Sequence, residues 1–137
     1  MAFIELIDGM LVGEEGIDSQ HKELIYKINM LHELIEAKAP KAEIEAIFAF
    51  LEHYVADHFG YEEELMEKYN YPETERHKAK HKHFVDEFLK ARDGFRAHTG
   101  DQLWPGMSGL ESLLKNWLVT HIMTIDKKLG QFLGLRV

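Results

Sequence analysis

The chain contains no cysteine, only 3 prolines, and no hydrophobic run of the roughly 18–20 residues needed to span a membrane. Without cysteine, disulfides, zinc–thiolate sites and iron–sulfur clusters are excluded. The N-terminus lacks a basic segment followed by a long apolar one, so no secretory signal is predicted. We therefore expect a soluble, cytoplasmic protein with no stable membrane insertion.

Positive charge is also scarce, because 16 Lys and Arg face 24 Asp and Glu and the formal net charge is −8. Nucleic-acid and anionic-membrane partners are disfavoured by this balance. The 137 residues are 45% hydrophobic and 11% aromatic. This length and composition predict one globular domain, 1–137, with its own apolar core.

Apolar residues recur with helical spacing in four stretches. They predict helices at about 18–37, 40–69, 73–98 and 108–126, after an extended arm at 1–16 and before a short helical tail at 127–137. Asp18 or Ser19 is the expected cap of the first helix, Pro40 suits the first turn of the second, and Ser108 with Glu111 forms a capping box. Short connections favour an all-α, antiparallel up-down-up-down four-helix bundle.

Seven potential metal ligands interrupt these apolar stripes. Burying an unpaired polar group costs several kcal/mol, so a cluster of them in a core requires a compensating partner. A pair of metal ions is the simplest one. The seven residues are His21, His58, Glu62, His77, His81, His121 and Asp126.

Helix direction predicts that these residues meet. In an up-down-up-down bundle, the start of the first and third helices and the end of the second and fourth share one end, and all seven lie within roughly 15 Å of it. His58/Glu62 and His77/His81 are i, i+4 pairs that each face one way. Asp126 follows His121 by five positions, so we expect the helix to distort or end between them.

The ligand types narrow the metal. Imidazole and carboxylate suit iron, zinc, copper or manganese, but seven ligands are too many for one tetrahedral zinc. Two irons sharing bridging carboxylates fit better. The Glu-x-x-His motif of ferritin-like di-iron proteins is absent, which disfavours that class.

Four segments of the sequence resemble a known family. IDSQHKEL (17–24), HFGYEEELM (58–66), HKAKH (77–81) and WLVTHIMTID (117–126) are similar to the motifs of hemerythrins in their single-domain bacterial form. The resemblance covers nearly the whole chain, from about residue 8 to 133. It implies a non-haem di-iron centre that binds O2 reversibly.

The resemblance also implies the role of each ligand. His77, His81 and His121 would bind one iron, His21 and His58 the other, and Glu62 and Asp126 would bridge both together with an oxo or hydroxo group. The second iron then has one open position. Hydrogen-bond acceptors for the histidine N–H groups are expected, although the sequence does not identify them.

The open position should face an apolar wall that excludes water and protons. Family analogy and helical proximity nominate Leu24, Phe59, Leu114, Trp117, Leu118 and Ile122. We expect a monomer that is not an enzyme and that serves oxygen transport, storage or supply to an oxygen-consuming enzyme.

Three alternatives remain. A di-iron peroxidase, oxidase or nitric-oxide-handling enzyme would need proton donors near the open position, and the predicted wall offers none. An oxygen or redox sensor is generally joined to a signalling domain, which is not expected in these 137 residues. Iron storage would call for a cage-forming assembly with carboxylate-rich sites.

Overall fold

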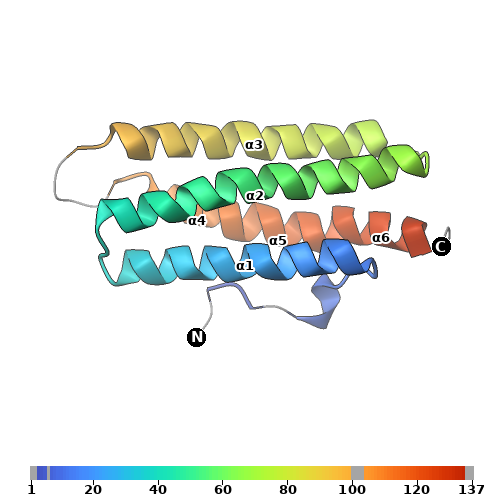
Figure 1. Ribbon diagram of the computed structural model, residues 1–137, viewed down its shortest axis with the longest axis horizontal. Helices are drawn as coiled ribbons and strands as arrows, with labels where there is room; N and C mark the ends of the chain where they lie inside the picture. Colours follow the sequence, from blue (N-terminus) through green and yellow to red (C-terminus); the bar gives the residue numbers. More distant parts are fainter. Residues whose placement is uncertain (1–2, 6, 100–103, 135–137) are drawn as a thin grey trace.

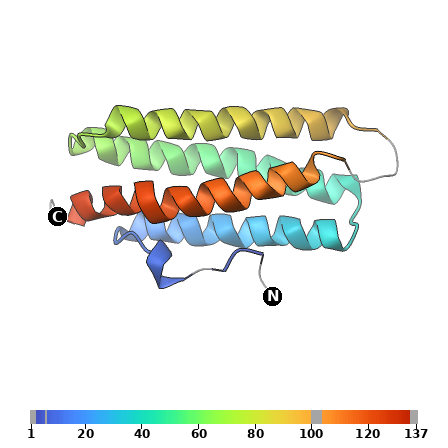
Figure 2. The ribbon, with the colours of Figure 1, turned by 180° about the vertical axis from the view of Figure 1, so that it is seen from behind.

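Four long helical segments lie side by side along the molecule (Figure 1). The computed structural model describes residues 3–5, 7–99 and 104–134, and parts of the predicted arm, last loop and tail lie outside these. Chain direction alternates from one segment to the next (Figure 2), which confirms the all-α up-down-up-down bundle. The elements are η1 Asp8–Met10, α1 Glu15–Glu36, α2 Lys41–Lys68, α3 Thr74–Ala97, and a fourth segment of α4 Met107–Ser112, η2 Leu113–Trp117, α5 Leu118–Thr120, η3 His121–Asp126 and α6 Lys127–Gly134.

Helix α1 begins earlier than the sequence predicts. Its cap is Glu14, whose carboxylate accepts a hydrogen bond from the Ile17 backbone N–H at 2.7 Å. The prediction of Asp18 or Ser19 as the cap was wrong, because Asp18 lies inside the helix and accepts from the Val12 N–H at 2.7 Å. Asp18 therefore fixes the arm against the helix start.

Two other predictions about helix starts were also wrong. Pro40 is the residue before α2, where its carbonyl begins the helix, and does not lie in the first turn. The capping box of Ser108 with Glu111 does not form, since α4 follows Gly106 with no side-chain cap. Glu111 instead pairs with the ring of His32 on α1.

The N-terminal arm is only partly extended. The short helix η1 closes a turn in which the Met10 N–H donates to the Ile7 carbonyl at 2.9 Å. Asn29 on α1 holds the arm by accepting from the Ile4 N–H at 2.7 Å and donating to the Ile4 carbonyl at 2.9 Å. Ile4 and Met10 are consequently buried in the core.

The fourth helical segment continues past residue 126, its predicted end, as α6. Leu129 and Leu133 are spaced i, i+4 and extend the buried stripe through α6. With Ile17, Met66 and other residues they form a second apolar cluster. The predicted helical tail is therefore confirmed over residues 127–134, where it prolongs the helix and packs on the bundle.

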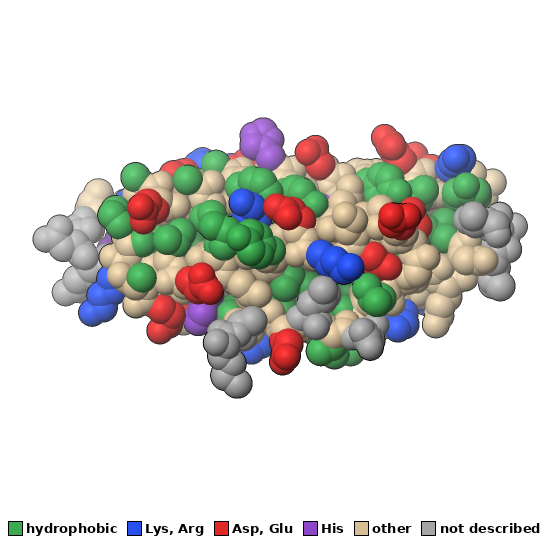
Figure 3. All heavy atoms as spheres, turned by 60° about the horizontal axis from the view of Figure 1, so that its bottom comes forward, with side chains coloured by type: hydrophobic (Ala, Val, Ile, Leu, Met, Phe, Trp, Pro, Cys, Tyr) green, Lys and Arg blue, Asp and Glu red, His purple; other side chains and the backbone are tan. Residues whose placement is uncertain are grey.

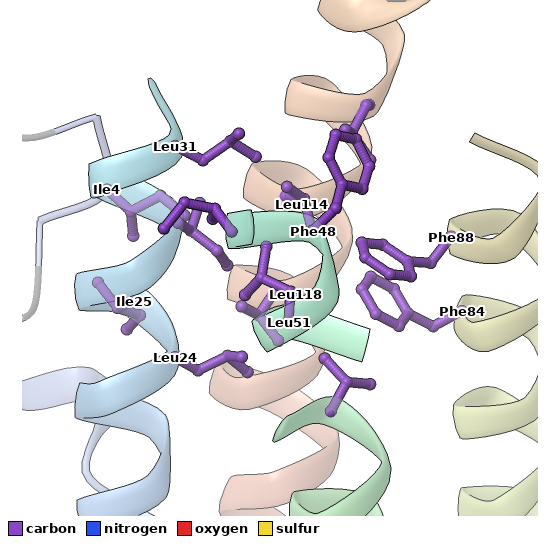
Figure 4. Packing of buried hydrophobic residues seen from close by; sticks show 14 of the residues in the cluster. Ile4, Leu24, Ile25, Leu31, Phe48, Leu51, Phe84, Phe88, Leu114 and Leu118 are labelled. Atoms are coloured by element: carbon purple, nitrogen blue, oxygen red, sulfur yellow. The ribbon is translucent and has the colours of Figure 1, made fainter. Parts of the chain in front are cut away.

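The core has two apolar parts with the polar residues between them. In the main cluster, side chains from all four helical segments point toward one another (Figure 4), and the rings of Phe48 and Phe88 lie 5.9 Å apart. Along α1, His21 falls between Ile17 of the second cluster and Leu24 of the main one. The site is therefore closed by apolar packing on both sides.

The surface in view mixes both signs of charge. On the face shown in Figure 3, acidic and basic side chains are interspersed with apolar ones, and no wide basic patch gathers there. Among the described residues, none of the helices combines the length and apolar character needed to cross a bilayer.

Candidate metal centre

Seven buried polar side chains meet at the end of the bundle where α1 begins, α2 ends and α3 begins (Figure 1, right-hand end). Each is at most 3% exposed. They are the residues that interrupted the apolar stripes: His21, His58, Glu62, His77, His81, His121 and Asp126.

Regular helix geometry orients four of them. His58 and Glu62 lie one turn apart on α2, and His77 and His81 lie one turn apart on α3, so each pair faces the bundle axis. The rings of His77 and His81 are 4.5 Å apart, edge to face.

A π-helical segment orients the last pair. η3 spans His121–Asp126, and in a π-helix the residues five apart lie above one another on the same face. The His121 Nε2 and Asp126 Oδ1 atoms are accordingly 2.9 Å apart. The helix distorts between these residues, as predicted, and then resumes as α6.

Glu62 presents one carboxylate oxygen to each of two histidine pairs. Its Oε1 lies 3.2 Å from His77 Nε2 and 3.1 Å from His81 Nε2. Its Oε2 lies 3.0 Å from His58 Nε2 and 3.4 Å from His21 Nε2. The carboxylate therefore lies between two groups of imidazoles.

Asp126 divides its oxygens in the same way. Its Oδ1 faces His121 and lies 3.0 Å from His77 Nε2, while Oδ2 lies 3.0 Å from His21 Nε2. Two donor groups result, and both carboxylates belong to each: Glu62, His77, His81, His121 and Asp126 in one, and His21, His58, Glu62 and Asp126 in the other.

The donor chemistry and spacing fit a pair of metal ions. Ligands at right angles around an ion, each about 2.1 Å from it, lie about 3 Å apart, which matches the nitrogen–oxygen spacings of the site. Within the described part of the chain, nitrogen atoms such as His21 Nε2, His58 Nε2 and His121 Nε2 are buried without a hydrogen-bond partner. A buried cation in each group would supply the missing partner.

The two buried carboxylates are negatively charged and are stabilised by positive charge nearby. Burial raises the pKa of Glu62, but close contacts with four histidine rings outweigh it and hold that pKa well below its usual value. The pKa of Asp126 is likewise lowered, against burial and the charge of Glu62, by its histidine contacts. Burial lowers the pKa of His21 and His77, yet both carboxylates together raise it to about 9.

Two further polar residues support the site from outside. Gln20 Oε1 lies 2.7 Å from His58 Nδ1, and Glu63 Oε2 lies 2.9 Å from His81 Nδ1. Neither residue was predicted from the sequence. Each is adjacent in sequence to a site residue, and a neighbour in a helix is rotated by about 100°, so it faces the next helix rather than the centre.

The six residues predicted to line an O2 pocket are mostly buried core residues. Phe59 stacks on His81 with ring centroids 3.8 Å apart, and the partly exposed Trp117 stacks on His121 at 4.4 Å. The other four belong to the main cluster: Leu24, Leu114, Leu118 and Ile122. A surface pocket of about 210 Å³ borders His77 from another side, and none of the six lines it.

Comparisons with known proteins agree on one family. Residues 12–133 match the family model of the hemerythrin HHE cation binding domain. A bacteriohemerythrin of Pseudomonas paraeruginosa is 34% identical over 92% of this chain and 78% of its own length. One from Methylococcus capsulatus is 31% identical over 85% of this chain and 86% of its own.

Solved structures give the same result. The crystal structure of a wild-type hemerythrin superposes with a TM-score of 0.82 at 27% identity, covering 95% of this chain and 97% of that one. A hemerythrin variant gives a TM-score of 0.83 at the same identity.

Proposed function

The chain belongs to the hemerythrin family, and from that premise we propose that it binds O2 reversibly at a pair of non-haem iron ions. The observation that supports this most is the inequality of the two donor groups. One offers three histidines and the other two, and both share Glu62 and Asp126. Two ions held in this way differ in how many positions the protein fills.

Counting donors locates the binding position. For two six-coordinate ions, the three-histidine group supplies five donors and the two-histidine group four. If a solvent-derived ligand were added to each ion, the ion held by three histidines would be complete and the ion held by two would keep a single open position. When bound, a pair of ferrous ions supplies two electrons to O2 and recovers them on release.

The role of the surrounding side chains is to exclude water and protons. Leu24, Leu118 and Ile122 are at most 1% exposed and belong to the main apolar cluster, which adjoins the donor groups along the helices. A dry, apolar wall keeps protons from the bound O2 and therefore favours release over further reduction. For this reason we propose a carrier, store or supplier of O2 rather than an enzyme.

The test is an optical cycle on iron-loaded protein. After anaerobic reduction, admitting O2 should produce a visible absorption band that disappears on deoxygenation and returns in later cycles. Protein loaded with zinc is the control and should show no band. Irreversible bleaching, or continued O2 consumption with added reductant, would favour the di-iron enzyme, and a band insensitive to O2 removal would contradict reversible binding.

A second measurement distinguishes an O2 carrier from an O2 sensor. A carrier should keep one structure with and without O2, whereas a sensor must couple binding to a conformational change. Equal solution scattering profiles in both forms would support carriage, and a clear difference would favour sensing.

A further inference from the structure

Only two of the five site histidines have a partner for their outer ring nitrogen among the described residues. His58 Nδ1 lies 2.7 Å from Gln20 Oε1, and His81 Nδ1 lies 2.9 Å from Glu63 Oε2. The Nδ1 atoms of the other three are buried without a hydrogen-bond partner. The two partnered rings belong to different donor groups.

Both contacts fix the tautomer that a metal requires. An ionised carboxylate only accepts, so His81 donates its Nδ1–H to Glu63 and keeps the lone pair on Nε2. The Gln20 amide oxygen also accepts, which places a hydrogen on His58 Nδ1 in the same way. In each case Nε2, the atom that faces Glu62, is free to bind an ion.

The two partners differ in charge. A hydrogen bond to a carboxylate is roughly twice as strong as one to a neutral amide, and it makes the imidazole a stronger donor to a metal. We propose that Glu63 and Gln20 are positioning residues that make the two metal positions unequal, strengthening the three-histidine position more than the two-histidine one. This inference rests on the metal binding in the proposed function but not on O2 binding.

The expected change in metal affinity can be estimated from other proteins in which a metal-binding histidine has such a hydrogen-bond partner. Losing an outer partner of a metal-binding histidine typically weakens metal affinity about 10- to 100-fold. The Glu63 side chain is 32% exposed, so water screens part of its charge and the lower end of that range is expected. The first ion to bind should therefore enter the three-histidine position.

The experiment is a stepwise titration of the metal-free full chain with Co²⁺, followed by calorimetry and visible absorption. Glu63→Gln keeps an acceptor and removes the charge, and it should weaken the first binding step about 10-fold. Gln20→Glu adds a charge behind the other group and should tighten the second step by a similar factor. The matched control is Glu64→Gln, which removes one charge from an exposed neighbour and should leave both steps unchanged.

Two further readouts separate positioning from a purely structural role. Thermal unfolding of the metal-free variants Glu63→Gln and Glu64→Gln should coincide. In the Co²⁺-loaded protein, proton NMR should show slowly exchanging imidazole N–H signals, and Glu63→Ala should remove the His81 one. If Glu63→Gln binds both ions as wild type does, or is weakened no more than Glu64→Gln, the inference is overturned even where O2 binding is intact.

Discussion

At the scale of single residues, the site depends on two ionised carboxylates that are completely enclosed. Glu62 and Asp126 each place one oxygen toward either donor group, so two ions held by the two groups would share both carboxylates. His77 is in contact with both carboxylates, through Oε1 of Glu62 and Oδ1 of Asp126. Removing this ring deprives two buried anions of a neighbour at once.

We expect His77→Ala to abolish the O2-dependent absorption band and to lower iron to one ion or fewer per chain. Losing one ligand of five weakens the three-histidine position, while the helices keep their packing. Iron analysis and far-UV circular dichroism would check this. His83→Ala, at an exposed position on the same helix, should retain iron and band. An unchanged band in His77→Ala would remove this residue from the metal centre.

Leu114 offers a test of the proposed apolar wall. It is 1% exposed and precedes His121 by seven positions on the fourth helical segment. Leu114→Phe should slow both O2 association and dissociation without loss of iron, at a stability cost of about 1–3 kcal/mol from overpacking. Stopped-flow measurements would detect the change, with the partly buried Leu113→Phe as comparison. Rates equal to wild type would reject a gating role for Leu114.

At the scale of elements, the π-helical turn and the arm decide how the fourth helix contributes. η3 lets His121 and Asp126 face one centre while α6 carries on with its own buried face. α6 then packs on the arm so closely that a Cβ on Gly130 would lie 1.9 Å from the Val12 carbonyl oxygen. Only glycine permits this approach.

Gly130→Ala should therefore displace the arm and cost about 1–3 kcal/mol of stability. Gly134→Ala, near the end of the same helix, should change stability little, because among the described residues no other segment comes within 4 Å of the added Cβ. Urea unfolding of both variants would measure the difference. Equal midpoints would show that the arm does not pack on α6 as described.

The elements also show what the sequence can and cannot predict. Periodic apolar residues were enough for the four helices, and the i, i+4 spacing of His58 with Glu62 was enough to expect a shared face. Caps failed because Asp18 and Glu111 have several possible partners, and the choice depends on segments far away in sequence. Gln20 and Glu63 each contact a histidine on a neighbouring helix. Which residues meet there depends on how the two helices are rotated relative to each other, and the spacing of residues within one helix does not reveal this rotation.

At the scale of the whole molecule, protons and metal ions compete for the same buried histidines and carboxylates. The carboxylates raise the pKa of His21 and His77 from 6.5 to about 9 in the metal-free fold. A group whose pKa is raised by folding stabilises the fold below its unfolded pKa, and this contribution is lost as pH rises toward the folded value. Metal affinity has the opposite dependence: it increases as pH rises, because the ligands must lose their protons before they bind an ion.

We therefore expect two opposite pH profiles between pH 6.5 and 9. The metal-free chain should lose stability as pH rises through this window, while the stabilisation added by Zn²⁺ should grow. Thermal unfolding with chelator and with saturating Zn²⁺ would measure both. Parallel profiles, or a metal-free chain that gains stability toward pH 9, would contradict the charge balance described for the site.

The measurement that tests the account most directly is the number of irons and of reversibly bound O2 molecules per chain, determined on one sample. The donor groups predict two irons, with a single O2 taken up after reduction and recovered under vacuum. One iron per chain, or two irons that take up no O2, would contradict a paired centre with one position left free by the protein.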